Sequence, residues 1–309
     1  MVNCEIPAAS ALIKPKNILS AQKLKTLNTR SNFKGLVQLV VHLSIAGLSG
    51  YIWIAMYHWS LKLPALIVYG FSLAAMFAVV HEASHRTAFA NNRLNDIVAW
   101  WAGVLSGYNS TFYRRFHKWH HRYTQIAGKD PELGDPKPSN LPEYLVEISG
   151  LNWWQGKLKT HYQIATGNLE HHPYIAENAA QEVIYSTRLQ LAIYGLAIAI
   201  SFTVGQPWFI TYWLLPLAVG QPILRLILLA EHTGCSLDNN PLTNTRTTLT
   251  WLPLHLLMWN MPFHAEHHLY PSIPFHALPQ AHQELQEYLA VCDRGYLKAN
   301  QKIIQDLYS

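Results

Sequence analysis

Residues 61–85 read LKLPALIVYGFSLAAMFAVVHEASH, an apolar stretch that runs directly into a pair of histidines. A helix of about 20 residues rises about 30 Å, the thickness of the hydrocarbon core of a bilayer, so residues 61–80 are long enough to cross one. His81 and His85 are four positions apart and therefore share one face of a helix. The stretch predicts a membrane-spanning helix that carries two imidazoles, common metal ligands, to the membrane surface.

The composition of the whole chain fits a membrane protein with a substantial polar portion. Of its 309 residues, 50% are hydrophobic and 13% are charged, whereas a soluble domain carries about 25% charged residues. This balance excludes a disordered chain, and the mean hydropathy of +0.03 argues against a protein wholly buried in lipid. The three cysteines have no metal-ligand spacing and are odd in number, which favours a reducing compartment over a disulfide framework.

Four apolar stretches are predicted to span the membrane as two hairpins with short outer loops. These stretches are 35–58, 61–80, 188–205 and 208–230. Lysine and arginine concentrate in the tail 1–34 and in the segment 81–186, and positively charged segments face the cytoplasm. We therefore expect an all-α, multi-pass integral membrane protein with both termini and the histidines on the cytoplasmic side. The apolar stretches 96–108 and 249–261 fall short of a span and are expected to be buried or interfacial helices in a cytoplasmic cap.

Three histidine motifs stand out in a chain with 17 histidines. Box one is His81-Glu82-Ala83-Ser84-His85, box two is His117-Lys118-Trp119-His120-His121, and box three is His264-Ala265-Glu266-His267-His268. On a helix, HxxxH places two imidazoles on one face, and HxxHH is expected to place three there. Their eight imidazoles exceed the ligands of one zinc ion. The boxes therefore predict a site for two metals, and zinc, copper, iron and nickel all suit nitrogen ligands.

At these boxes the sequence resembles the membrane fatty acid desaturase family, which carries HxxxH, HxxHH and HxxHH boxes, four spanning helices and a cytoplasmic di-iron site. The flanks of the boxes resemble a bacterial branch of that family. These flanks are His81-Glu82 with Arg86–Phe89, Asp130–Leu133, Ala230–Gly234, Trp259–Phe263 and Pro271–Pro279. The likeness covers roughly 35–285 as a desaturase-like domain, which leaves 1–34 as a basic N-terminal tail and 286–309 as a cytoplasmic C-terminal tail.

The resemblance implies a ninth ligand, His232, just beyond the fourth span. Two irons (Fe2+/Fe3+) would then be held by His81, His85, His117, His120, His121, His232, His264, His267 and His268. Asn260, four residues before His264, is expected to share its helical face and to hold a metal-bound water. A metal-bound imidazole usually donates its other N–H to a carboxylate or carbonyl. The acidic residues expected behind the ligands are Glu82, Asp130, Glu231 and Glu266, with Glu132 as a further candidate.

The activity implied by the resemblance is a dioxygen-dependent desaturation of a fatty acyl chain taken from the bilayer through an apolar tunnel. Expected tunnel walls are Trp100, Trp101, Trp119 and Tyr113. The sequence has no GxGxxG or Walker loop, so two electrons are expected from a separate ferredoxin, or a cytochrome with its reductase. A basic face would attract an acidic carrier or anionic headgroups. It comprises Arg114, Arg115, Lys118 and Arg122. Arg225 is expected to extend toward headgroups, and nothing points to nucleic acid.

Three other functions share parts of this pattern. A di-iron hydroxylase or ketolase acting on a lipid or carotenoid would use the same boxes, because it abstracts the same kind of hydrogen and then transfers oxygen. Box one matches the HExxH motif of zinc proteases, with Glu82 as general base, but that function leaves boxes two and three without a role. A metal transporter would bind near the bilayer midplane, whereas the boxes lie at the cytoplasmic ends of the predicted spans.

Overall fold

A computed structural model describes residues 18–134 and 137–308, so half of the expected N-terminal tail lies outside the described residues. The fold is mostly helical. Among the described residues, four helices are long and apolar enough to cross a membrane. They are α2 (Asn32–Ala55), α3 (Trp59–Ser84), α8 (Glu177–Val204) and Ile210–His232, which joins the π-helical turn η3 (Ile210–Leu214) to α9 (Leu215–His232).

Helix α8 begins well before the apolar stretch that predicts it. Its first turns carry Glu177 and Glu182, so hydropathy alone does not detect them. Val183, Ile184 and Thr187 are nevertheless buried, on the part of the helix that packs against α5 (Ser110–Tyr123) and α7 (Leu151–Ala165). The burial of this face extends the helix upstream of the span.

Helix α3 is the most deeply buried of the membrane-length helices. In its most apolar window, 72% of the residues are buried inside the protein, compared with 28% in α2 and in α8. It crosses α9 at two glycines. A Cβ atom added to Gly70 would lie 2.2 Å from the carbonyl oxygen of Pro216, and one added to Gly220 would lie 2.0 Å from the carbonyl oxygen of Gly70. Only glycine permits this approach, which brings the ends of α3 and α9 together.

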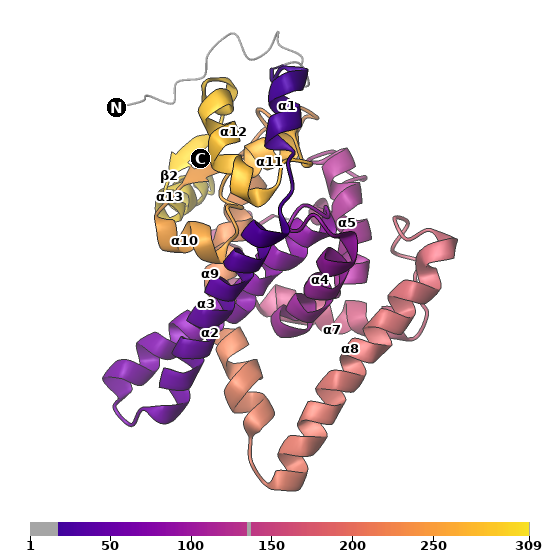
Figure 1. The fold of residues 1–309 in the computed structure, drawn as a ribbon, viewed down its shortest axis with the longest axis vertical. Helices are drawn as coiled ribbons and strands as arrows, with labels where there is room; N and C mark the ends of the chain where they lie inside the picture. The colour runs from indigo at the N-terminus through magenta and orange to yellow at the C-terminus, as the bar shows by residue number, and fades with distance from the viewer. Residues whose placement is uncertain (1–17, 135–136, 309) are drawn as a thin grey trace.

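The remaining helices gather around one end of the four long helices (Figure 1). They are α1 (Ala21–Leu27), α4 (Asn92–Ser106), α5, η2 (Pro131–Leu133), α6 (Leu141–Ser149), α7, α10 (Leu252–Leu257), α11 (His264–Leu269), η4 (Phe275–Ala277), α12 (Leu278–Leu285), η5 (Gln286–Tyr288) and α13 (Tyr296–Asp306). The short apolar stretches 96–108 and 249–261 fall in α4 and around α10, and neither is among the four membrane-length helices.

The segment 286–309, expected as a tail, packs against the rest of the protein over its described part. Strand β2 (Cys292–Arg294) pairs in parallel with β1 (Thr247–Leu249). Buried Asp293 accepts a hydrogen bond of 3.0 Å from Arg246. Helix α13 packs on α9, where the amide of Asn300 donates to the carbonyl of Leu226 at 3.0 Å. These contacts anchor the end of the chain beside the helix that carries His232.

Candidate metal centre

Four helices bring all nine predicted histidines together. His81 lies in the last turn of α3 and His85 caps its end. Box two occupies α5, His232 is the last residue of α9, and box three occupies α11. Local sequence explains where α5 begins, because the Asn109 side chain accepts a hydrogen bond from the backbone N–H of Phe112 and so caps this helix.

The imidazoles form two groups. The five-histidine group comprises His81, His85, His117, His121 and His267, and the three-histidine group comprises His120, His232 and His268. Within each group, one ligand atom per residue lies within 4.8 Å of all the others. The Nε2 atom of His264 adjoins the three-histidine group, 3.3 Å from that of His232 and 3.1 Å from that of His268.

The HxxHH boxes divide between the groups, so the expectation that each box points three imidazoles one way is wrong. His117 and His121, four apart on α5, join the five-histidine group, whereas His120 joins the other. On α11, His264 and His268 lie together and His267 faces the five-histidine group. The reason is helical geometry: neighbouring residues are about 100° apart around the axis, so an adjacent pair cannot share a face.

The distances between ring nitrogens fit bound metal ions. Nε2 of His121 lies 3.0 Å from Nε2 of His117 and 3.1 Å from Nε2 of His267. Two nitrogens bound about 2.1 Å from one metal at a right angle would be about 3 Å apart. Nε2 of both His81 and His85 is buried without a hydrogen-bond partner among the described residues. A buried polar atom without a partner is costly, and a metal ion would satisfy both.

Burial also keeps these imidazoles in the form that binds metals. It lowers the pKa of His85 to about 3, with help from the nearby charges of His120 and Arg114. Burial, followed by repulsion from neighbouring histidines, lowers the pKa of His117, His121 and His267 well below its usual value. At neutral pH these rings are therefore uncharged, as metal ligation requires.

In the three-histidine group, each ring has a second partner on its Nδ1 side. His120 meets a carboxylate oxygen of Asp130 at 2.9 Å. His232 meets the carbonyl of Asn244 at 3.1 Å, and His268 meets the hydroxyl of Thr124 at 3.3 Å. Such contacts orient a metal-binding ring and select the nitrogen that faces the metal.

The four predicted acidic residues have different surroundings. Asp130 lies behind His120, as described above. Glu231 approaches Nε2 of His264 at 3.5 Å, so it faces the centre itself. Glu82 accepts the backbone N–H of Phe275 at 2.9 Å and joins α3 to η4. Glu266 turns away from the centre. It contacts the hydroxyl of Thr247 and the ring of His282.

Asn260 does not share a helical face with His264. Helix α11 begins only at His264, and between it and Asn260 lies Pro262, which disfavours helical backbone at the residue before it. Asn260 itself has a left-handed backbone, with φ of 57°. Its side-chain amide donates to the carbonyl of Phe275 at 3.0 Å. Asn260 therefore holds the turn that leads into box three.

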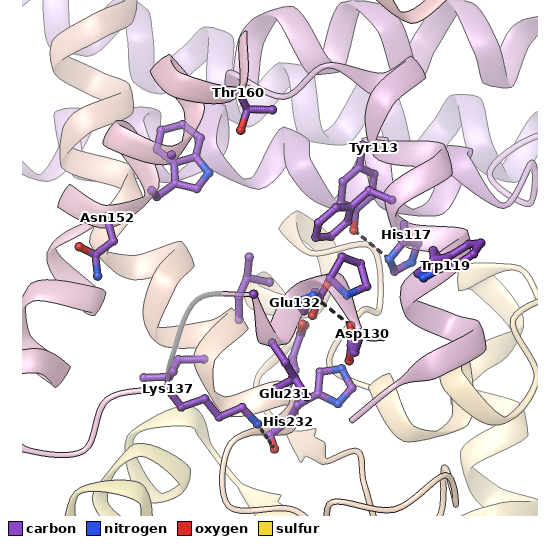
Figure 2. Close-up of a pocket in the computed structure, with 18 of the residues that line it drawn as sticks. Tyr113, His117, Trp119, Asp130, Glu132, Lys137, Asn152, Thr160, Glu231 and His232 are labelled. Atoms are coloured by element: carbon purple, nitrogen blue, oxygen red, sulfur yellow. Dashed lines mark hydrogen bonds between the residues drawn. The ribbon is translucent and has the colours of Figure 1, made fainter. Parts of the chain in front are cut away.

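A cavity of about 700 Å³ opens beside the centre. Four of the nine histidines line it: His81, His117, His232 and His264. Figure 2 shows His117, Glu231 and His232 on one side of the cavity, with Asn152 and Thr160 of α7 on the other. Of the expected tunnel walls, Tyr113 and Trp119 line this cavity, whereas Trp101 is 54% exposed.

A second cavity of about 640 Å³ reaches the centre from another direction. His85, His121 and Trp100 line it, together with several charged residues. Two members of the expected basic face are neutralised here, because Arg114 pairs with Asp96 and Arg115 pairs with Glu182.

Sequence reasoning missed a cationic end of the first cavity. The expectation that Arg225 extends toward headgroups is wrong: its guanidinium donates to the hydroxyl of Tyr108 at 2.7 Å and lines the cavity. Lys157 of α7 lines it too. The sequence did contain a signal that Arg225 faces the centre, because Arg225 and His232 are seven residues apart and so share a face of α9. No comparable sequence signal pointed to Lys157, since its position depends on how α7 packs.

Comparisons with known proteins identify a family and several related sequences. A profile of the family described as fatty acid desaturase matches residues 57–299. An sn-1 oleoyl-lipid 12-desaturase from Picosynechococcus sp. is 25% identical over 273 residues, which cover 80% of this chain and 76% of that protein. A Delta(5) fatty acid desaturase from Caenorhabditis elegans is 24% identical over 268 residues, covering 76% and 59%. An alkane 1-monooxygenase from Acinetobacter baylyi is 26% identical over 219 residues, covering 69% and 51%.

Proposed function

This chain belongs to the fatty acid desaturase family and is an oxidoreductase, and we propose that it is a membrane di-iron enzyme that introduces a double bond into a fatty acyl chain. The observation that carries the proposal is the convergence of nine histidines beside a cavity, eight of them in the two groups and His264 next to the three-histidine group. We assign one iron to the five-histidine group and the other to the three-histidine group with His264.

The protein's own residues have distinct roles in this proposal. Bound iron would supply the activation of dioxygen and the removal of hydrogen from an unactivated C–H bond. The apolar side chains of Phe77, Tyr113 and Leu228 line the cavity and would hold the acyl chain and exclude water. Asp130 would orient the ring of His120. Two hydrogens leave neighbouring carbons, and two electrons from a separate ferredoxin or cytochrome, together with two protons from solvent, complete the reduction of dioxygen to two waters.

The topology supports a cytoplasmic site. The loops joining α2 to α3 and α8 to η3 lie at the end of the molecule opposite the capping helices (Figure 1). We infer that the spans form two hairpins with these loops outside, and that the capping helices and the centre face the cytoplasm. Lys118 and Arg122, for which no ion pair is formed within the described residues, are then the members of the basic face that remain for docking an acidic electron carrier.

Hydroxylation is the second candidate, and the alkane 1-monooxygenase relative favours it. Both reactions begin by removing hydrogen from the same kind of carbon. Loss of a second hydrogen gives an alkene, whereas transfer of oxygen gives an alcohol. A zinc protease is not proposed, because Glu82 of the HExxH motif is 3% exposed and binds the backbone of Phe275.

Metal content and lipid products test the proposal together. The protein is expressed in a bacterial host, purified in detergent for elemental analysis, and the host lipids are compared with those of cells producing a His264→Ala variant. We expect about two irons per chain and acyl chains with a new double bond that the variant does not form. Hydroxylated acyl chains would show that the enzyme is a hydroxylase, the second candidate, and not a desaturase. A single zinc ion, retained when box two is mutated, would overturn both.

A further inference from the structure

The end of the first cavity away from the histidines is rich in hydrogen-bond donors. The Tyr108 oxygen accepts from the indole N–H of Trp153 at 3.0 Å and from the Arg225 guanidinium at 2.7 Å. The ammonium of Lys157 lies 3.9 Å from the centre of the Tyr108 ring. Since the phenol oxygen already receives two hydrogen bonds, its own O–H is available as a further donor. Two cations and a hydroxyl thus meet at one place.

Within the described part of the chain, no carboxylate contacts these donors directly. Among the described residues, neither Lys157 nor Arg225 forms an ion pair, and Nε of Arg225 is buried without a hydrogen-bond partner. Glu132 and Glu231 line the same cavity, but they approach His120 and His264, at 3.6 Å and 3.5 Å. Burial, followed by repulsion from Arg225, lowers the pKa of Lys157 to about 7. An anion bound between the two cations would remove this repulsion.

The position of the donors relative to the histidines suits the head of a long chain. Arg225 and His232 are seven residues apart on α9, which corresponds to about 10 Å along the helix axis. Phe77, Tyr113 and Leu228 line the same cavity and supply apolar surface for a chain. A headgroup held at Arg225 would therefore place carbons in the interior of the chain, rather than those beside the headgroup, near the metal centre.

We propose that Lys157, Arg225 and Tyr108 bind the anionic headgroup, a carboxylate or a phosphate, of the acyl substrate, and thereby select which carbons reach the histidines. Lysine and arginine bind both anions, and arginine can hold either with two parallel hydrogen bonds. This inference rests on the proposed function, because it takes the cavity to be the acyl site. It adds to that function a class of substrate: acyl chains whose head carries a negative charge.

Direct binding tests this inference without turnover. Three radiolabelled probes share one long acyl chain: a free fatty acid, the lysophosphatidic acid and the uncharged methyl ester. Each is titrated against the purified metal-loaded protein in detergent. Lys157→Gln is compared with Lys159→Gln, an exposed neighbour on the same helix, and Arg225→Gln is compared with the charge-conserving Arg225→Lys. Thermal unfolding of each variant checks that the fold is retained.

We expect Lys157→Gln to lower the affinity for the two charged probes by about tenfold or more. Its affinity for the methyl ester should be unchanged, and Lys159→Gln should bind all three probes as the unmodified protein does. Arg225→Lys should recover part of the affinity lost in Arg225→Gln. A loss confined to the fatty acid identifies the carboxylate as the natural head, and a loss confined to the lysophosphatidic acid identifies the phosphate. Equal weakening of all three probes, no change in the charged ones, or no binding of any probe would overturn the inference.

The headgroup site and the proposed function can be refuted separately. A protein that desaturates lipids but binds the charged probes equally well with and without Lys157 would refute the headgroup site and leave the proposed function intact. A protein that binds the charged probes through Lys157 but forms no new double bond would refute the proposed function alone.

Discussion

The two histidine groups differ in how the protein holds their rings. Each ring of the three-histidine group has a partner on Nδ1, the strongest being Asp130 behind His120. In the five-histidine group, His117 meets the hydroxyl of Tyr113 at 3.2 Å, but Nδ1 of both His121 and His267 is buried without a partner among the described residues. The three-histidine group thus has fewer imidazoles, and each has a second partner. The five-histidine group has more imidazoles, and these are held mainly by packing.

The two histidine groups also differ in the negative charge around them. Glu132 and Glu231 lie within 4 Å of His120 and His264, beside the three-histidine group. Among the described residues, no carboxylate lies that close to the five-histidine group. Burial lowers the pKa of His120, but the carboxylates of Glu132 and Asp130 outweigh it and raise the pKa overall. The comparison teaches that the protein compensates for fewer imidazoles with nearby negative charge.

Removing one ligand from each group is the strongest test of the division. His232→Ala and His85→Ala should each lower activity by more than about 100-fold, because even changes behind a ligand cost about 10- to 100-fold. Each variant should lose the metal of its own group and keep the other, as measured by iron content per chain. His58→Ala, at an exposed position outside both groups, serves as the control. Loss of both irons from either variant would show that the groups are one indivisible site.

The glycine crossing of α3 and α9 holds the two groups beside each other. Gly220→Ala places a Cβ atom 2.0 Å from the carbonyl oxygen of Gly70, so the helices must separate. We expect a loss of about 1–3 kcal/mol in stability and weaker retention of both metals, measured by thermal unfolding and metal analysis. Gly195→Ala on α8 meets nothing within 4 Å and provides the matched control. Equal melting temperatures for the two variants would contradict the role of the crossing.

The partners behind the rings offer a subtler comparison. Asp130→Asn retains the shape of the side chain but removes its charge, so metal affinity in the three-histidine group should fall about 10- to 100-fold. Tyr113→Phe removes the hydroxyl behind His117 and should cost less, because a neutral partner bonds more weakly than a carboxylate. Competition with a chelator measures both affinities. A larger effect from Tyr113→Phe would reverse the proposed contrast.

Acidification should destabilise the metal-free protein. The pKa values of His117, His121 and His267 are lowered by burial, whereas histidine in an unfolded chain has a pKa of about 6.5. Below that pH the unfolded chain binds protons that the native protein does not, so stability falls as the pH drops below about 6.5.

Removing one such histidine measures its share of the pH dependence. In metal-free His121→Gln, the slope of unfolding free energy against pH between 6 and 5 should fall by up to about 1.4 kcal/mol per pH unit. Denaturation at several pH values gives this slope, and His58→Gln should leave it unchanged. An unaltered slope in His121→Gln would show that its ring is already protonated in the native state.

The sequence by itself was sufficient to predict the membrane-length helices and the nine histidines that the structure brings together. The helices and the eight box histidines follow from local patterns, namely hydropathy sustained over a span and residues four apart on one helical face, whereas His232 was predicted only from the resemblance to the desaturase family. The contact between Asp130 and His120 could be anticipated for a similar reason, because the two residues are only ten positions apart in the sequence.

Only the tertiary structure decided which histidine group each face of a box joins, where Glu82 and Glu266 point, and that Arg225 faces a cavity. These depend on contacts between distant segments, such as the backbone of Phe275 against Glu82 and the hydroxyl of Tyr108 against Arg225. Periodicity places a side chain on a face of its own helix, but the group that this face meets is set by how helices cross. Here that crossing depends on the close backbone approach of Gly70 and Gly220.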